Sequence, residues 1–322
     1  MGMAVLPFPY LTPPLTKGNS IIQCCHSQTE PISNGQARFP SVVPPRPRRI
    51  ILVRHGESEG NVDESVYTRI PDPKISLTDK GRAQAEECGY RIKKMIQKDA
   101  DQHWQVYFYV SPYRRTLQTL QSLARPFQRS TIAGFREEPR IREQDFGNFQ
   151  NREKMRVEKE LRKLYGRFFY RFPDGESAAD VYDRITGFRE TLRTDINIGR
   201  YQPPGKKKTE MNLIIVSHGL TLRVFLMRWY KWTVQQFEGL NNMGNGDMLV
   251  MEKGYVCGNL KGVRMNRYSL LMHHGEEELR RFGMTDEMLM DQEWHKCARP
   301  ADLNYDCPMV NSFFPHLSEE TS

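Results

Sequence analysis

The sequence lacks any apolar run long enough to cross a membrane. A membrane helix needs about 20 consecutive apolar residues, whereas the longest apolar stretches here, such as 213–216, have the length of a buried strand. Cysteine is also scarce, with six residues in 322, and their spacings fit neither a disulfide framework nor a metal-binding motif. We therefore expect a protein with no membrane partner and no bound metal, in a reducing environment.

Acidic residues are nearly absent from the first 47 residues, which contain one acid, Glu30, beside nine prolines and seven serines or threonines. The prolines interrupt any apolar segment that a secretory signal would need. Two interpretations of this segment stay open. It is either a transit peptide for a chloroplast or mitochondrion, which the motif at 21–25 favours, or an ordinary disordered extension of a cytoplasmic protein.

Positive charge predominates, with a formal net charge of +8. The first 49 residues carry half of it, as five basic residues and one acid. The rest of the chain has no basic stripe interleaved with stacking aromatic residues, so we expect no nucleic-acid partner. A mildly basic folded body suits an anionic substrate instead.

Residues 48–255 are expected to form one domain in which strands and helices alternate. Apolar and β-branched runs predict buried strands at 50–54, 106–110, 213–217 and 248–251. Helices are expected from Thr78 to about residue 98, from Pro112, over 152–172, after the capping pair Ser177 and Asp180, and from 218 to 229. This alternation predicts a three-layer α/β/α sandwich around a mainly parallel sheet.

Two further segments lie at the margins of this pattern. Residues 256–322 are expected to form a tail that packs on the domain, with one helix from Thr285 to about Cys297. The stretch 152–171 has eight basic residues against three acids. Most such runs are solvated helix faces, and a role in holding polyanionic substrates is the alternative. One face of this helix is expected to carry four apolar residues: Leu161, Leu164, Phe168 and Phe172.

Three of the predicted strands end in charged or titratable residues followed by a turn. The endings are Arg54–His55–Gly56, Ser111 with Arg115 four residues later, and Ser217–His218–Gly219. Because ligands bind at the carboxyl ends of parallel strands, we expect two imidazoles and two guanidiniums to meet around one anion. Arginine forks match phosphate oxygens, and the glycines let the backbone approach closely. The sequence therefore predicts a phosphate site.

The chemistry of phosphoryl transfer suggests a role for each titratable group. Nearby cations lower the pKa of His55 and leave one ring nitrogen free to attack phosphorus. His218 is expected to act as an imidazolium that donates to the phosphoryl oxygens. Glu143 is the best candidate acid for the leaving oxygen, ahead of Glu57 and Glu138. Activity should then be highest somewhat below neutral pH, with Glu143 protonated and His218 charged.

These residues resemble the histidine phosphatase superfamily, and within it the phosphoglycerate mutase-like proteins, plant members included. The resemblance spans residues 50–251 and rests on four blocks in family order: 54–58 with Asn61, Ser111 with Arg115 and Thr119, 141–143 with Gly147, and 217–219. It implies that His55 becomes phosphorylated and that Glu143 donates the proton. It also implies that the phosphate pocket is formed by Arg54, Arg115 and His218. The loop that contacts the substrate would contain Ser58 and Asn61.

The chain also departs from the mutases of this family. Gly60 stands where they usually carry a tryptophan, and Phe146–Gly147 replaces their tyrosine–glycine pair. These departures favour hydrolysis of phosphate monoesters, and a role in carbohydrate metabolism is the expected setting. Phosphoglycerate mutase is the alternative function, and a catalytically silent module that binds a phosphorylated ligand is the second. The expected partner is a phosphorylated small molecule, with no cofactor; the oligomeric state stays open.

Overall fold

The computed structural model describes residues 44–99, 103–147, 152–201, 209–254 and 268–292. All of them belong to one unit of the chain, Val43–Ser322. Most of the N-terminal segment that was predicted to be a transit peptide or a disordered extension, residues 1–43, lies outside the described residues. Both interpretations of that segment therefore stay predictions.

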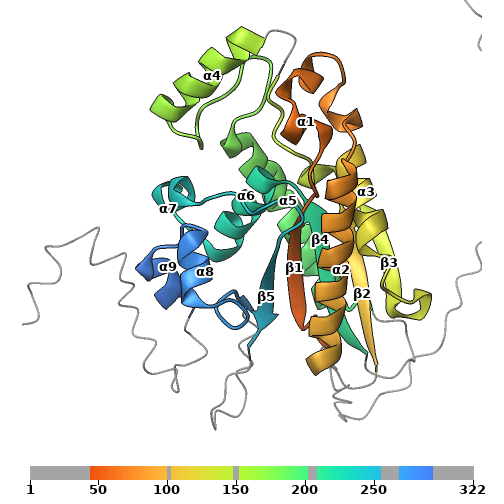
Figure 1. Ribbon diagram of the computed structural model, residues 1–322. Helices are drawn as coiled ribbons and strands as arrows, with labels where there is room; N and C mark the ends of the chain where they lie inside the picture. The colour runs from red at the N-terminus through yellow and green to blue at the C-terminus, as the bar shows by residue number, and fades with distance from the viewer. Residues whose placement is uncertain (1–43, 100–102, 148–151, 202–208, 255–267, 293–322) are drawn as a thin grey trace, which may run out of the picture. The chain divides into compact units, whose positions relative to one another are not determined.

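A six-stranded sheet runs through this unit (Figure 1). In spatial order its strands are β3 (Ile132–Glu137), β2 (Trp104–Val110), β4 (Glu210–Ser217), β1 (Arg49–Arg54), β5 (Met248–Lys253) and β6 (Tyr268–Ser269). The first four strands are parallel, whereas β5 and β6 are antiparallel to their neighbours. The mainly parallel sheet is thus confirmed, and β3 and β6 are strands that the sequence did not predict.

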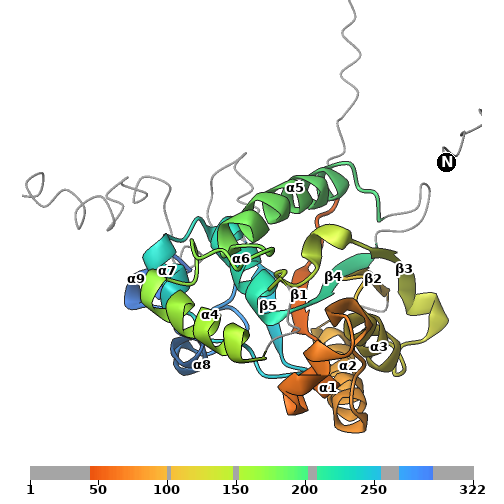
Figure 2. The ribbon, with the colours of Figure 1, turned by 90° about the horizontal axis from the view of Figure 1, so that it is seen from above.

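Helices cover both faces of the sheet, as Figure 2 shows from above. The helical segments are α1 (Glu59–Val62), η1 (Glu64–Thr68), η2 (Asp72–Lys74), α2 (Asp79–Asp99), α3 (Arg114–Leu123), η3 (Arg129–Thr131), η4 (Pro139–Ile141), α4 (Arg152–Tyr165), α5 (Ala178–Asn197), α6 (Gly219–Tyr230), α7 (Val234–Gly239), α8 (Glu276–Arg281) and α9 (Asp286–Met290). One face packs against α2 and α3 and the other against α5 and α6. The three-layer α/β/α sandwich is confirmed.

Strand β1 is buried on both faces of the sheet. Its residues Ile50 and Leu52 point into the core shared with α5 and α6, and Ile51 and Val53 point into the core shared with α2 and α3. All four side chains are fully buried. Successive side chains of a strand face opposite sides of the sheet, so a continuous apolar run suits a strand covered by helices on both faces.

Helix α4 is shorter than the sequence predicted, because it ends at Tyr165 rather than near residue 172. The next residue, Gly166, has a φ of +99°, a conformation that glycine adopts readily and that commonly ends a helix. Leu161 and Leu164 are consequently exposed on α4, whereas Phe168, past the helix end, is buried in the core. The single apolar helix face predicted for 152–172 was wrong.

The other helix starts follow their capping residues closely. The Oγ1 of Thr78 accepts from the amide of Gly81 at 3.0 Å, and Ser177 and Asp180 form the expected reciprocal cap of α5. Helix α3 begins at Arg114 with Tyr113 as its N-cap, so Pro112 precedes the helix instead of opening it. None of the described helices combines the length and apolar character needed to cross a membrane.

Residues 268–292 contribute to the same core as the rest of the unit. Strand β6 pairs with β5, and Leu270, Leu279 and Leu289 are buried in the core that α5 and α6 share. The helix predicted from Thr285 begins there as α9, capped by Thr285, but it ends at Met290 and not near residue 297. Residues 255–267 and 293–322 lie outside the described residues.

Candidate active site

The strand register brings three chain segments to one edge of the sheet. Val216 of β4 pairs with Val53 of β1 on one side and with Val110 of β2 on the other, so the three strands end at the same level. The next residues are tied together as well, because the amides of His55 and Ser111 donate to β4 carbonyls at 3.0 Å. Parallel strands therefore place the predicted residues side by side without any long loop.

The two predicted histidines lie next to each other at this edge. Their ring centroids are 5.3 Å apart and the ring planes are inclined by 62°. His55 is 4% exposed and His218 is fully buried. Although 163 positions separate them in sequence, the fold places the two imidazoles side by side, as expected from the strand ends.

A single contact fixes the tautomer of His55. Its Nδ1 lies 2.7 Å from the carbonyl oxygen of Gly56, which can only accept, so Nδ1 carries the proton. Burial, followed by the positive charges of Arg115 and Arg54, holds the pKa of His55 well below its usual value. The ring is therefore neutral, and Nε2 keeps a lone pair for attack on phosphorus.

The neighbouring glycine lets the loop after β1 lie directly against helix α2. A Cβ on Gly56 would lie 2.1 Å from the carbonyl oxygen of Gly81, in the first turn of that helix. The Gly56 amide donates to Thr119 Oγ1 of α3 at 3.1 Å. The backbone around His55 is thus fixed by two helices, and glycine at position 56 is required by a close approach of backbone to backbone.

His218 differs from the prediction in its charge. Burial, together with Arg115, His55, Arg184 and Arg54, holds its pKa well below the usual value, so the ring is neutral in this structure and not an imidazolium. Its Nε2 lies 2.8 Å from the hydroxyl of Ser111, and its buried Nδ1 has no hydrogen-bond partner among the described residues. A neutral His218 that accepts from Ser111 would donate through Nδ1.

The two predicted arginines reach the same pocket from different elements. Arg54 ends β1 and donates from Nη1 to the carbonyl oxygen of Met243 at 2.5 Å, while its buried Nε has no partner among the described residues. Arg115 of α3 is 3% exposed and lies over the ring of Tyr113 at 4.9 Å. Burial is the main reason why the pKa of both histidines is lowered, and the positive charges of Arg115 and Arg54 lower it further.

Glu143 follows η4 and lies close enough to Arg54 and Arg115 for both charges to affect its pKa. Its Oε1 accepts from its neighbour's amide, Gln144 N, at 3.0 Å and from Thr221 Oγ1 at 3.4 Å. Burial raises the pKa of Glu143, and the nearby Arg115 and Arg54 oppose that rise without cancelling it. A carboxyl group with a raised pKa is suited to donating a proton.

Arg184, which the sequence analysis missed, holds the loop that carries Glu143. From α5 its guanidinium donates to the carbonyl oxygens of Arg140, Arg142 and Glu143 at 2.6, 2.9 and 3.0 Å. The same side chain pairs with both carboxylate oxygens of Glu176 at 3.1 and 3.0 Å. No local pattern indicates this role, because Arg184 lies in the middle of a helix.

The predicted substrate loop is held mainly by its own contacts. The amide and hydroxyl of Ser58 both donate to Asn61 Oδ1 at 3.0 Å, and Asn245 Nδ2 donates to the same oxygen at 3.1 Å. A Cβ on Gly60 would lie 2.7 Å from the ring of Tyr67, so a larger side chain at this position would require that ring to move. Contact of Ser58 and Asn61 with a substrate stays a prediction.

Gly219 lies at the start of α6, beside Arg54. A Cβ at this position would come within 2.7 Å of Asn242 Oδ1 and 3.5 Å of Arg54 Nε. The close contact is with the Asn242 side chain, which would have to shift to admit a Cβ, whereas 3.5 Å to Arg54 is an ordinary contact distance. Direct contact of Gly219 with a substrate stays a prediction as well.

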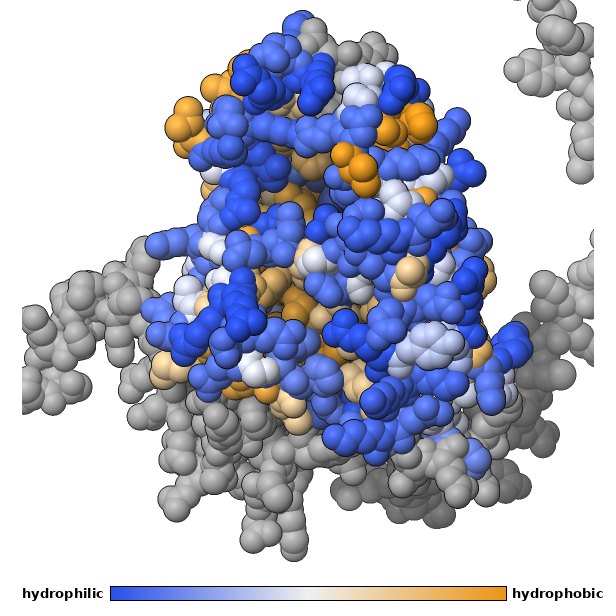
Figure 3. Space-filling view, viewed as in Figure 1, coloured by the Kyte–Doolittle hydropathy of each residue, from blue (hydrophilic) through white to orange (hydrophobic). Residues whose placement is uncertain are grey.

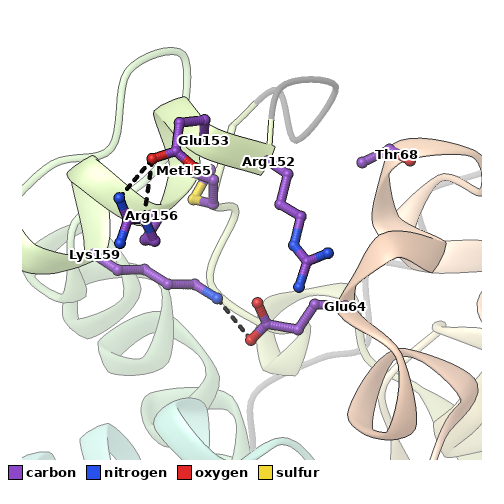
Figure 4. A pocket seen from close by; sticks show the side chains of 7 residues that line it. All are labelled: Glu64, Thr68, Arg152, Glu153, Met155, Arg156 and Lys159. Atoms are coloured by element: carbon purple, nitrogen blue, oxygen red, sulfur yellow. Dashed lines mark hydrogen bonds and ion pairs between the residues drawn. The ribbon is translucent and has the colours of Figure 1, made fainter.

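A pocket open to solvent lies between α4 and η1 (Figure 4). Lys159 of α4 donates to Glu64 of η1 at 2.8 Å, and Arg156 pairs with Glu153 at 2.6 Å. Arg152 has no ion pair that the described residues supply, and in Figure 4 it points towards Glu64. Figure 3 shows apolar residues exposed at the upper left, over α4, where Val157, Leu161 and Leu164 have large exposed fractions.

Metal ligands were not expected from the sequence. Within the part of the chain that the structure describes, no three or more His, Cys, Asp or Glu side chains are grouped in a way that would hold a metal ion.

Comparison with known proteins gives a consistent result. The model of the histidine phosphatase superfamily (branch 1) matches residues 50–254. Phosphoglycerate mutase-like protein AT74 of Arabidopsis thaliana is 52% identical over 275 residues, which cover 85% of this chain and 84% of that protein. For AT74H of the same plant the identity is 51% over 251 residues, covering 77% and 85%. The broad-range acid phosphatase DET1 of Saccharomyces cerevisiae is 31% identical over 291 residues, covering 64% and 86%.

Proposed function

The chain belongs to the histidine phosphatase superfamily, in its phosphoglycerate mutase-like branch, and on that premise we propose that it hydrolyses phosphate monoesters through a phosphohistidine at His55. The observation that carries the proposal is the state of His55. Its Nδ1 proton is held by the Gly56 carbonyl, and burial together with two nearby arginines keeps its pKa low, so the neutral ring offers Nε2 as a nucleophile next to positive charge.

In the first step, His55 Nε2 attacks the phosphorus of the ester. A P–N bond forms as the P–O bond to the alcohol breaks, and the protonated Glu143 carboxyl gives its proton to the leaving oxygen. The raised pKa of Glu143 supports this role because the carboxyl keeps its proton until the transition state needs it. The alcohol then leaves the site.

In the second step, water replaces the alcohol. The Glu143 carboxylate takes a proton from the water, whose oxygen forms a new bond to phosphorus while the P–N bond breaks. Inorganic phosphate is released, and Glu143 and His55 return to their starting states. Each step moves one proton and one phosphoryl group, so the cycle needs no cofactor.

Charge stabilisation would come from the groups around His55. Phosphoryl transfer depends on positioning and on donors to the equatorial oxygens of the phosphoryl group. Arg54 Nε and His218 Nδ1 are buried without a hydrogen-bond partner among the described residues, which supports their assignment as such donors. Arg115 supplies a third positive group at the same site.

A labelling experiment tests the covalent step. Brief incubation with a phosphomonoester carrying radioactive phosphate, followed by rapid denaturation, should leave an acid-labile label on the protein. Substitution of His55→Ala should remove this label. A catalytically silent binding module would give no label with any substrate, and a label that persists in His55→Ala would contradict the assignment of the nucleophile.

Incubation with 3-phosphoglycerate separates hydrolysis from mutase activity, which the names of the two Arabidopsis relatives keep as the alternative. A phosphatase releases inorganic phosphate and forms no 2-phosphoglycerate. A mutase holds the phosphoryl group and returns it to another hydroxyl. Sugar phosphates and glycerate phosphates are the first members of a substrate panel, scored by released phosphate, because we propose a role in carbohydrate metabolism.

A further inference from the structure

Asp72 contacts the arginine that is proposed to bind phosphate. Its carboxylate oxygen Oδ1 accepts from Arg115 Nη1 at 2.6 Å, and Oδ2 lies 3.4 Å from Nη2. The main-chain carbonyl of Asp72 accepts from the same Nη1 at 2.8 Å. This negative charge therefore lies inside a cluster of groups that otherwise favour anions.

The segment that carries Asp72 is held firmly in place. Asp72 begins η2 between two prolines, Pro71 and Pro73, which restrict the backbone on both sides. Ile75, at the end of η2, is fully buried. Two residues later, the amide of Leu77 donates to Gln118 of α3 at 2.7 Å. The carboxylate is therefore part of the built site and not the end of a freely moving loop.

The contact places a carboxylate oxygen where a phosphoryl oxygen would compete for the same N–H group. Nη1 of Arg115 already has two acceptors from Asp72, so a phosphate oxygen there must displace or share one of them. The carboxylate also repels a phosphate dianion. Both effects lower the affinity of the pocket for phosphate, whether it is part of a substrate or the released product.

We propose that Asp72 competes with phosphate for Arg115 and so keeps the affinity for the inorganic phosphate product low. The inference rests on the proposed function, because it concerns the same pocket. A pocket with two guanidiniums and two imidazoles would hold the product dianion tightly, and release of product limits many enzymes. Asp72 weakens that binding while its carbonyl oxygen keeps the Arg115 guanidinium in position.

Calorimetric titration of the full chain with inorganic phosphate tests the competition directly. The substitution Asp72→Asn removes the charge but keeps an oxygen that can accept from Arg115. We expect it to lower the dissociation constant of phosphate by about tenfold or more. The control is Asp79→Asn, which removes the same charge from an exposed position at the start of α2 and should leave the constant unchanged.

Kinetics give a second readout of the same proposal. Inorganic phosphate should inhibit Asp72→Asn at lower concentrations than it inhibits the wild-type chain, and KM should fall rather than rise. Asp72→Ala, which keeps only the main-chain acceptor, should change both values in the same direction and provides a second variant if Asp72→Asn folds poorly.

Unchanged or weaker phosphate binding in both Asp72 variants would overturn the proposal, because a residue that only supports Arg115 cannot improve binding when it is removed. The measurement does not depend on turnover. If the wild-type chain hydrolysed no ester, the proposed function would fail, whereas the comparison of phosphate affinities would still decide the role of Asp72.

Discussion

The sheet edge that carries His55 and His218 and helix α4 are built in opposite ways. At the edge, His55, Arg115 and His218 are almost completely buried. His55 and His218 directly follow two paired strands, and the Gly56 amide beside His55 donates to α3. On α4, only Met155 is buried, Leu164 is 87% exposed, and the ion pairs join exposed side chains. One region is fixed by many contacts and the other by few.

This contrast indicates where substitutions are tolerated. Groups that perform chemistry need positions fixed to a fraction of an ångström, and packed strands supply this. A helix that rests on a few polar contacts can vary in sequence and position without disturbing those groups. We therefore expect substitutions at the edge to act on turnover, and substitutions on α4 to act on substrate choice.

The largest effect is expected for Glu143→Gln. Loss of the acid should lower kcat/KM by about 10² to 10⁴-fold for esters of ordinary alcohols. Since the wild-type enzyme needs the protonated carboxyl in the first step, its kcat/KM should fall as pH rises through the raised pKa of Glu143. The variant should lose this alkaline limb. Rates measured against pH with an alkyl phosphate check both points.

Two comparisons make this prediction sharp. With p-nitrophenyl phosphate, whose leaving group needs no proton, the loss should be much smaller. Glu57→Gln removes a carboxylate from the same loop as His55, where it pairs with Lys80, and should keep the alkaline limb. An equal loss with both substrates, or an alkaline limb that remains in Glu143→Gln, would assign the proton transfer to another group.

The next effect is expected for Arg184→Met. Arg184 and Glu176 are largely buried, and removal of one partner of such a pair leaves the other charge without compensation. We expect a loss of about 3 kcal/mol in the free energy of unfolding, together with lower kcat/KM because the Glu143 loop loses its support. Urea denaturation and initial rates measure the two. Arg193→Met, on the exposed side of α5, is the control and should change neither; a stable and fully active Arg184→Met would show that the loop is held by other contacts.

The sequence was sufficient to predict which residues meet at the sheet edge, because the sequence patterns that indicate them are local. Each of the three strands is a short apolar run, and the titratable residues follow directly in the chain. Parallel register then brings the strand ends level, so the meeting of His55 and His218 could be predicted without knowing any loop. The charge of His218 could not be predicted in this way, because burial and the surrounding arginines lower its pKa.

Other features depend on contacts between distant segments and leave no local pattern. Arg184 reaches the Glu143 loop from the middle of α5, and Asp72 reaches Arg115 from a loop 43 positions earlier. The end of α4 was a different kind of error, because Gly166 was a visible signal that the apolar periodicity outweighed. Position in the chain predicts the strand ends, whereas only the folded structure reveals which side chains reach them.

A smaller effect is expected for Gly56→Ala. The added methyl group would meet the main-chain oxygen of Gly81 at 2.1 Å, so backbone has to move. We expect a cost of about 2 kcal/mol in stability, and slower turnover because His55 is the preceding residue. Thermal and urea denaturation measure the first. Gly275→Ala is the matched control, since a Cβ there meets nothing within 4 Å. If both variants were equally stable, the close packing of the His55 loop on α2 would not be what fixes it.

The smallest effect is expected where α4 meets η1. Lys159 and Glu64 are 37% and 62% exposed, so their ion pair should contribute less than about 1 kcal/mol to the free energy of unfolding. A double-mutant cycle with Lys159→Ala and Glu64→Ala measures this coupling, and it should weaken further in high salt. The same variants should change KM between substrates of different size while kcat stays within about twofold. A coupling energy as large as the stability loss expected for Arg184→Met would contradict this contrast between α4 and the sheet edge. A large fall in kcat would contradict it as well, because α4 would then be as essential to the chemistry as the edge.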